Sequence, residues 1–140
     1  MARDEKLELL HGIPLFARFD HKHLARLGML TEEVDVPAGK VLMREGDSAD
    51  AFYMIVNGTV RIERTGSAPR ELGPGQWLGE IALVDHGPRT ATATTVSPAR
   101  LLVLGHREFD QMLDKHPGFR AQVMESLAKR VRNLEPDANH

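Results

Sequence analysis

The segment from Glu32 to Gly105 is a series of short apolar or alternating runs, and a turn signal closes each run. The turns contain Pro-Ala-Gly, Glu-Gly-Asp, Asn-Gly and Gly-Pro-Gly, which favour tight reversals of the chain. Near its end, Ser97-Pro98 separates two further runs, because proline cannot continue a central strand. Short strands at this spacing predict an antiparallel barrel or sandwich.

Helix-spaced apolar residues precede this β segment. Leu7 and Leu10 mark a first helix, and a second helix follows Pro14 with Asp20 as its N-cap. We therefore expect short helices within residues 4–30, ahead of the strands at residues 32–105.

Two more helices are predicted after the strands, within residues 106–134. The first ends before Pro117, and the second places four apolar residues on one stripe, namely Val123, Leu127, Val131 and Leu134. We expect this stripe to pack on the barrel. Formation of a homodimer through it is the alternative.

Composition limits the classes of protein to consider. A chain of 140 residues, 41% of them hydrophobic, has the size of one compact domain, so we expect residues 1–140 to form a single domain. The net charge of −2 argues against a nucleic-acid-binding surface over the whole protein. No apolar run approaches the ~20 residues of a membrane span, and the charged N-terminus is unlike a signal peptide, which predicts a cytoplasmic protein. The lack of cysteine excludes thiol catalysis and Cys-ligated metals.

Residues 79–93, GEIALVDHGPRTATA, place one carboxylate and one guanidinium among small and apolar neighbours. If Glu80 and Arg89 are buried, each needs a partner, because an unpaired buried charge is strongly unfavourable. They either pair with each other or bind a ligand. A salt bridge between them would not explain Gly79, Ala82 and Thr90. A one-turn helix opening at Gly79 would instead point backbone N–H groups at a small anion, which the glycine lets approach closely.

The two charges require different ligand groups. Arg89 can donate two hydrogen bonds to a phosphate, and Thr90 can add a hydroxyl and an N–H. Glu80 only accepts hydrogen bonds when it is ionised, so it needs a hydroxyl such as that of a ribose. A cyclic nucleotide meets both requirements, because its phosphate is fused to the sugar and leaves the 2′-hydroxyl free.

The stretch GEIALVDHGPRTATA resembles the phosphate-binding cassette of the cyclic-nucleotide-binding domains of bacterial catabolite-activator-type regulators, protein kinase A regulatory subunits and nucleotide-gated channels. The resemblance covers about residues 7–134 and implies a jelly roll, or double-stranded β-helix, with a short phosphate-binding helix inside the barrel. The residues that carry it are Gly39, the Glu45-Gly46-Asp47 turn, Gly58, and Gly79, Glu80, Ala82, Pro88, Arg89 and Ala91 in the cassette.

This resemblance implies a role for each cassette residue. Glu80 would bind the ribose 2′-hydroxyl, Arg89 the cyclic phosphate, and the backbone amides of Ala82 and Thr90 would assist. The ligand-binding set is then Gly79, Glu80, Ile81, Ala82, Arg89, Thr90 and Ala91. We favour cAMP as the commoner bacterial messenger. Thr90 keeps cGMP as a second candidate ligand, because a threonine at this place helps to bind guanine in some nucleotide-gated channels.

Residues that would contact the base are less clearly marked. Ile62 and Leu72 are candidates from the strands, although strands supply core residues everywhere. The polar residues with which the activators cap the base would fall near Leu134 and Glu135, so Leu134 is expected to cap by apolar packing. The activators continue into a DNA-binding helix-turn-helix, which we do not expect within these 140 residues, and the protein partner or output domain is unknown.

Enzymatic readings are not favoured. Seven histidines invite comparison with a cupin-type metal site, but they lie at helix ends and in a loop rather than in pairs on strands. No Ser-His-Asp or paired-carboxylate arrangement indicates hydrolysis. We therefore expect no enzyme, no metal and no cofactor, but a regulatory sensor that transmits binding by moving its C-terminal helices. The alternative is a fold that has lost its ligand and serves as an interaction scaffold.

Overall fold

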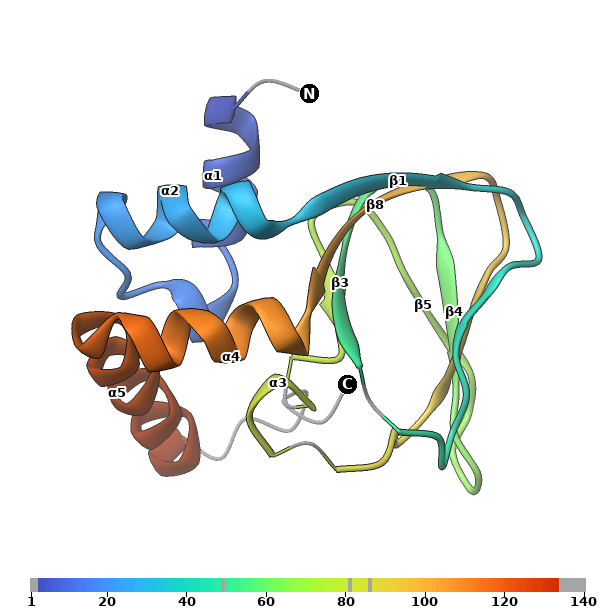
Figure 1. Ribbon diagram of the computed structural model, residues 1–140. Helices are drawn as coiled ribbons and strands as arrows, with labels where there is room; N and C mark the ends of the chain where they lie inside the picture. The colour runs from blue at the N-terminus through green and yellow to red at the C-terminus, as the bar shows by residue number, and fades with distance from the viewer. Residues whose placement is uncertain (1–2, 49, 81, 86, 134–140) are drawn as a thin grey trace.

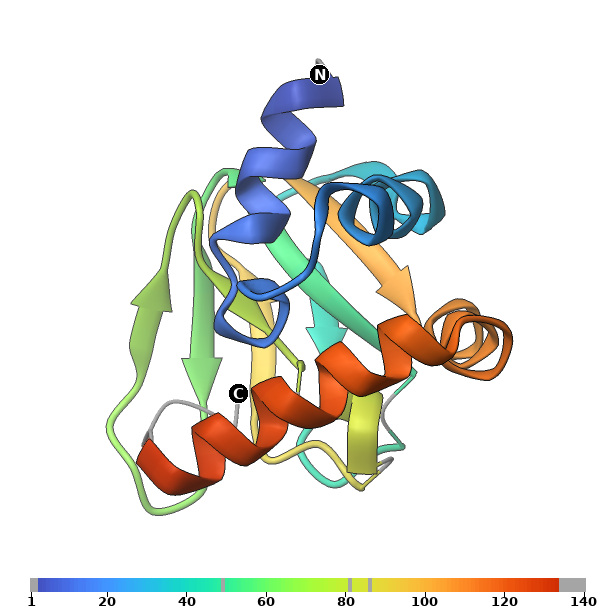
Figure 2. The ribbon, with the colours of Figure 1, turned by 90° about the vertical axis from the view of Figure 1, so that its left-hand side faces the viewer.

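The computed structural model describes residues 3–48, 50–80, 82–85 and 87–133. Two β-sheets form one end of the molecule, and the longer helices gather at the other end (Figures 1 and 2). This arrangement confirms the predicted fold, which is mainly β and of jelly-roll type, with helices before and after the strands in the sequence.

The strands form two four-stranded antiparallel sheets. The first has the order β1 (Glu32–Val36), β8 (Ala99–Gly105), β3 (Ala51–Asn57) and β6 (Trp77–Leu78). The second has the order β2 (Val41–Met43), β7 (Thr92–Thr95), β4 (Val60–Glu63) and β5 (Arg70–Leu72). Of the two arrangements left open by the sequence, the described residues thus show the sandwich. The break at Ser97-Pro98 is confirmed, since β7 ends and β8 begins on either side of it.

Side chains between the two sheets form one of two hydrophobic clusters. It contains Ile62 and Leu72 together with the small residues Ala91 and Ala93. The second cluster joins the first sheet to the helices through aromatic rings that pack edge to face, among them Phe16 on Phe52 and Phe109 on Phe119. Strand β3 contributes to both, since Ile55 lies in the first cluster and Phe52 in the second. The helices therefore pack on β3, and the backbone of this strand also contacts Arg89.

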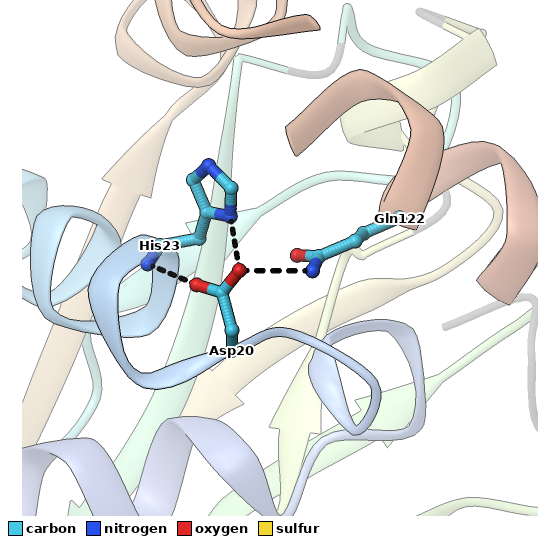
Figure 3. A network of polar contacts seen from close by, with 3 residues as sticks. All are labelled: Asp20, His23 and Gln122. Atoms are coloured by element: carbon cyan, nitrogen blue, oxygen red, sulfur yellow. Dashed lines mark hydrogen bonds and ion pairs between the residues drawn. The ribbon is translucent and has the colours of Figure 1, made fainter. Parts of the chain in front are cut away.

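The N-terminal helices are α1 (Arg3–His11) and α2 (His21–Leu30), with a 3₁₀ turn η1 (Pro14–Phe16) between them. The predicted cap is confirmed: Oδ1 of Asp20 accepts a hydrogen bond from the backbone N–H of His23, at 2.8 Å. The second oxygen of the same carboxylate lies 3.0 Å from Nδ1 of His23 and accepts from Nε2 of Gln122 at 3.2 Å (Figure 3). This carboxylate thereby joins the start of α2 to the C-terminal region.

The C-terminal helices are α4 (His106–Lys115) and α5 (Pro117–Asn133). The expectation for the apolar stripe of α5 is wrong: Val123 is buried and Leu127 is half-buried, but Val131 is 70% exposed, and Leu134 lies outside the described residues. The main neighbours of α5 are η1 and α4 rather than the strands. Its buried side is instead set by Phe119, which packs on Phe19 and Phe109. None of the helices in the described ranges has the length and apolar character needed to cross a membrane.

Candidate phosphate-binding site

Arg89 and Glu80 are both buried, with 5% and 2% of their surface exposed. The guanidinium of Arg89 donates through Nη2 to the backbone oxygen of Ala51. The same nitrogen lies 3.7 Å from the carboxylate of Asp50, and the group lies 6.0 Å from the centre of the Tyr53 ring. Burial lowers the pKa of Arg89, while Tyr53 and Asp50 oppose that shift. Since arginine titrates far above neutral pH, the group stays charged.

The other terminal nitrogen of this guanidinium has no such contacts. Nη1 of Arg89 is buried and has no hydrogen-bond partner among the described residues. A buried charged donor without an acceptor is costly, and such atoms are rare in folded proteins. The site therefore offers a positively charged N–H to an oxygen that the described part of the chain does not supply.

Gly79 makes room for Arg89. Its φ of +88° lies in the left-handed region that favours glycine. A Cβ built on Gly79 would collide with Nη1 of Arg89 and would lie 3.1 Å from the oxygen of Ala51. The sequence suggested that this glycine lets a ligand approach the main chain. In the structure the absence of a side chain at this glycine also leaves space for the guanidinium of Arg89.

The short helix of the cassette begins later than expected. Helix α3 spans Ala82–Asp85, and the backbone N–H of Leu83 donates to the oxygen of Glu80 at 3.1 Å. The prediction that this helix opens at Gly79 is wrong, because a left-handed glycine cannot be the first residue of a right-handed helix. Glu80 thus lies in the bend before the helix, and α3 contacts β3 and α4.

The backbone of Arg89 is held by the Glu45-Gly46-Asp47 turn. The N–H of Gly46 donates to the oxygen of Arg89, and the N–H of Arg89 donates to the oxygen of Asp47, each at 2.8 Å. The carboxylate of Glu45 accepts two bonds of 2.9 Å from the N–H and hydroxyl of Thr65. These bonds lower the pKa of Glu45. The turn therefore links the backbone of Arg89 to the loop between β4 and β5.

The remaining predicted residues lie at different depths. Thr90 is exposed, whereas Ala91 is buried between the sheets. The candidate base contacts Ile62 and Leu72 are 2% and 5% exposed and share that inter-sheet cluster. Ile81 and Leu134 lie outside the described residues. The described ranges contain no group of three His, Asp or Glu side chains arranged to hold a metal.

A model of the cyclic nucleotide-binding domain matches residues 33–116, which include all the described strands except the first residue of β1. The chain belongs to this family.

Two solved structures share the fold. The N-terminal domain of a transcriptional regulator from Streptomyces coelicolor A3(2) is 34% identical with a TM-score of 0.79, and the match covers 90% of this chain and 92% of that one. The regulatory domain of Toxoplasma gondii PKA, solved with cAMP, is 30% identical with a TM-score of 0.70, over 78% of this chain and 43% of that one.

One curated relative is considerably longer than this chain. The CRP-like cAMP-activated global transcriptional regulator of Mycobacterium tuberculosis is 30% identical over 130 residues. The match covers 89% of this chain but 58% of that relative. The chain thus spans a little over half the length of this relative.

Within this cyclic nucleotide-binding domain, reasoning from the sequence missed the residues of β3 that hold the guanidinium. Ala51 lies 38 positions from Arg89 in the chain. Neither Ala51, Asp50 nor Tyr53 is part of the cassette pattern, and only the sheet topology brings them to it. A weak signal was available, because Asp50 directly precedes a strongly apolar strand and so lies at its edge.

Proposed function

We propose that this domain is a sensor that binds a cyclic nucleotide, with the cyclic phosphate on Arg89 and the ribose 2′-hydroxyl on Glu80. The single observation that carries this proposal is the buried Nη1 of Arg89, which lacks a hydrogen-bond partner among the described residues. A phosphate oxygen would accept from it, and charge-assisted bonds of this kind are strong. The proposed ligand-binding set remains Gly79, Glu80, Ile81, Ala82, Arg89, Thr90 and Ala91.

Two relatives support a cyclic nucleotide and make cAMP the first ligand to test. One is named as cAMP-activated, and the other was solved with cAMP. The choice between adenine and guanine depends on the residues that contact the base. The proposal concerns a binding module rather than an enzyme.

Transmission is proposed to proceed through α4 and α5. Helix α3, which follows Glu80, contacts α4 directly. A shift of the cassette on binding would therefore be passed to the C-terminal helices. The docked position of α5 also contains unsatisfied groups: Oε1 of Gln122 and Oγ of Ser126 are buried without hydrogen-bond partners in the described part of the chain. Such groups weaken packing, so a second position of α5 that satisfies them would be close in free energy. A ligand that favours that position would move the helix.

A partner that binds the outer face of α5 would respond to such a movement. Small and apolar residues recur there at alternating spacings of three and four, and all are exposed: Ala121, Met124, Ala128 and Val131. This spacing is typical of a helix that packs along another helix. A homodimer through this face is one form of the proposal, and a separate protein partner is the other.

Two measurements test the function. Isothermal calorimetry with cAMP and cGMP should give saturable binding, and AMP and GMP should bind at least about tenfold more weakly, because opening the ring moves the phosphate and adds charge. No heat and no thermal shift at millimolar nucleotide would favour the scaffold alternative. Hydrogen exchange should then show altered protection in residues 106–133 on binding. Protection confined to residues 79–92 would mean that binding is not transmitted through this end.

A further inference from the structure

The beginning of α2 and the end of α4 lie side by side at the helical end of the molecule (Figure 1). The ring of His23, in α2, has its centre 6.4 Å from that of His116, which follows α4. A Cβ built on Gly118, near the start of α5, would lie 3.3 Å from Cε1 of His23. Three helices therefore meet around these two histidines.

Cationic side chains surround this meeting point. Lys22 and Arg26 are one turn apart in α2, so they lie on the same side of that helix, and both are exposed. Lys115, the last residue of α4, is exposed as well. Partial burial lowers the pKa of His116, and positive charges lower it further, namely those of Arg26, His23, Lys22 and Lys115. We call this group the cationic junction, which consists of Lys22, Arg26, Lys115 and His116.

The three permanent cations of the cationic junction are not neutralised by carboxylates of the described residues. The side chains of Lys22, Arg26 and Lys115 make neither ion pairs nor hydrogen bonds within the ranges that the structure describes. Other exposed arginines do contact carboxylates, namely Arg18, Arg61, Arg100 and Arg120. Like charges that lie close together repel one another, and an arriving anion would remove that repulsion. The cationic junction is therefore suited to a negatively charged partner.

Carboxylates limit the size of the cationic junction. Asp20 lies beside it at the N-terminus of α2, where it accepts from the backbone N–H of His23. Asp114 directly precedes Lys115 in α4 and pairs with Arg120 at 3.2 Å. Nucleic acid needs a continuous positive face, whereas these carboxylates and the net charge of −2 would repel a long polyanion. A short segment that carries a few carboxylates fits within these limits.

We propose that the cationic junction is a docking surface for an acidic segment of a partner protein. The planar guanidinium of Arg26 can donate two hydrogen bonds to one carboxylate, and the ammonium groups of Lys22 and Lys115 attract further carboxylates. These groups come from α2 and α4, so one bound segment would bridge two helices. The surface shares no residue with the outer face of α5, and it selects charged rather than apolar side chains.

His116 makes this docking dependent on pH. In the free protein, burial and the neighbouring cations disfavour its charged form. A bound carboxylate would offset those cations and raise the pKa of His116, so the complex would bind more protons than the free protein. Affinity should therefore rise as the pH falls from about 7.5 to 5.5, while the acidic side chains of the segment stay ionised. His23 should contribute less, because its Nδ1 already lies 3.0 Å from the carboxylate of Asp20.

The test is a titration of the purified chain, without cyclic nucleotide, with a fluorescein-labelled hexaglutamate peptide. Fluorescence anisotropy at low salt should show saturable binding, and a hexaglutamine peptide should not bind. The double variant with Arg26→Ala and Lys115→Ala should bind at least about fivefold more weakly, because each exposed ion pair contributes up to about fivefold. His116→Gln should remove the rise in affinity between pH 7.5 and 5.5, the range in which histidine titrates.

A charge-matched control lies beside β2, in the second sheet. The double variant with Lys40→Ala and Arg44→Ala also removes two exposed cations, and it should bind the peptide within about twofold of wild type. Thermal unfolding checks that each variant folds. Equal losses in the two double variants, or no saturable binding by wild type, would overturn the docking surface. Tighter binding of a duplex DNA oligonucleotide that depends on Arg26 and Lys115 would overturn the choice of an acidic protein segment. None of these results depends on whether a cyclic nucleotide binds to Arg89.

Discussion

Gly79 and the guanidinium of Arg89 occupy adjoining space, so that a single methyl group on residue 79 would displace Nη1 of Arg89. Gly79→Ala should therefore abolish tight nucleotide binding and lower the free energy of unfolding by more than the ~1–2 kcal/mol of left-handed backbone strain alone. Gly39 is the matched control, because its φ is +83° and a Cβ there would meet nothing within 4 Å. Denaturant unfolding and calorimetry of both variants separate strain from collision. Equal effects of the two substitutions would contradict this account.

Arg89→Lys should weaken binding of a cyclic nucleotide by about 1.5–3 kcal/mol, the contribution of a hydrogen bond to a charged group. Lysine keeps the charge but cannot donate to Ala51 and to the phosphate at once from a planar group. Calorimetry measures the loss. Arg100→Lys, in an exposed pair with Asp35, should not change affinity. An affinity retained in Arg89→Lys would show that the site needs only a charge.

Asp50→Asn should strengthen binding about two- to fivefold. The Asp50 carboxylate lies 3.7 Å from Nη2 of Arg89 and is 80% exposed, so it competes weakly with an incoming phosphate and repels it. Asp47→Asn is the control, because Asp47 contributes only its backbone oxygen to Arg89. Unchanged or weaker binding in Asp50→Asn would mean that Asp50 supports the bound position of Arg89 instead.

Glu80→Gln should weaken the parent cyclic nucleotide more than its 2′-deoxy analogue. If Glu80 accepts from the 2′-hydroxyl, removing either partner removes the same hydrogen bond, so the two changes should not add. Four titrations, of wild-type and variant protein with each ligand, complete the cycle. Full additivity would place Glu80 away from the ribose.

Ser126→Ala should raise the free energy of unfolding by about 1 kcal/mol, because the buried hydroxyl has no hydrogen-bond partner among the described residues. It should also reduce the ligand-induced change in hydrogen exchange over residues 117–133, since the docked position of α5 would be favoured. Ser48→Ala, at an exposed position, serves as the control for stability. A destabilised Ser126→Ala variant would show that the hydroxyl is satisfied in solution.

Features set by neighbouring residues were predictable from the sequence. Asp20 caps α2 as expected, and Ser97-Pro98 ends a strand, because both effects act within a few residues. The side of α5 that is buried was not predictable in this way. Apolar spacing grouped Val131 with Val123, but Phe119 and the aromatic cluster that it joins decide which side is buried. Likewise, the cassette pattern identified Arg89, whereas its contacts with Ala51, Asp50 and Tyr53 depend on strand packing.

The two oxygens of Asp20 have a further consequence. One fixes the first turn of α2 and the other accepts from Gln122 of α5, so a single exposed side chain ties the beginning of the chain to its last helix. Loss of this carboxylate would leave every proposed phosphate contact in place and remove this link between α2 and α5. Binding and response would then be separable: the protein would still bind nucleotide, but α5 would lack one of the contacts that fix its position.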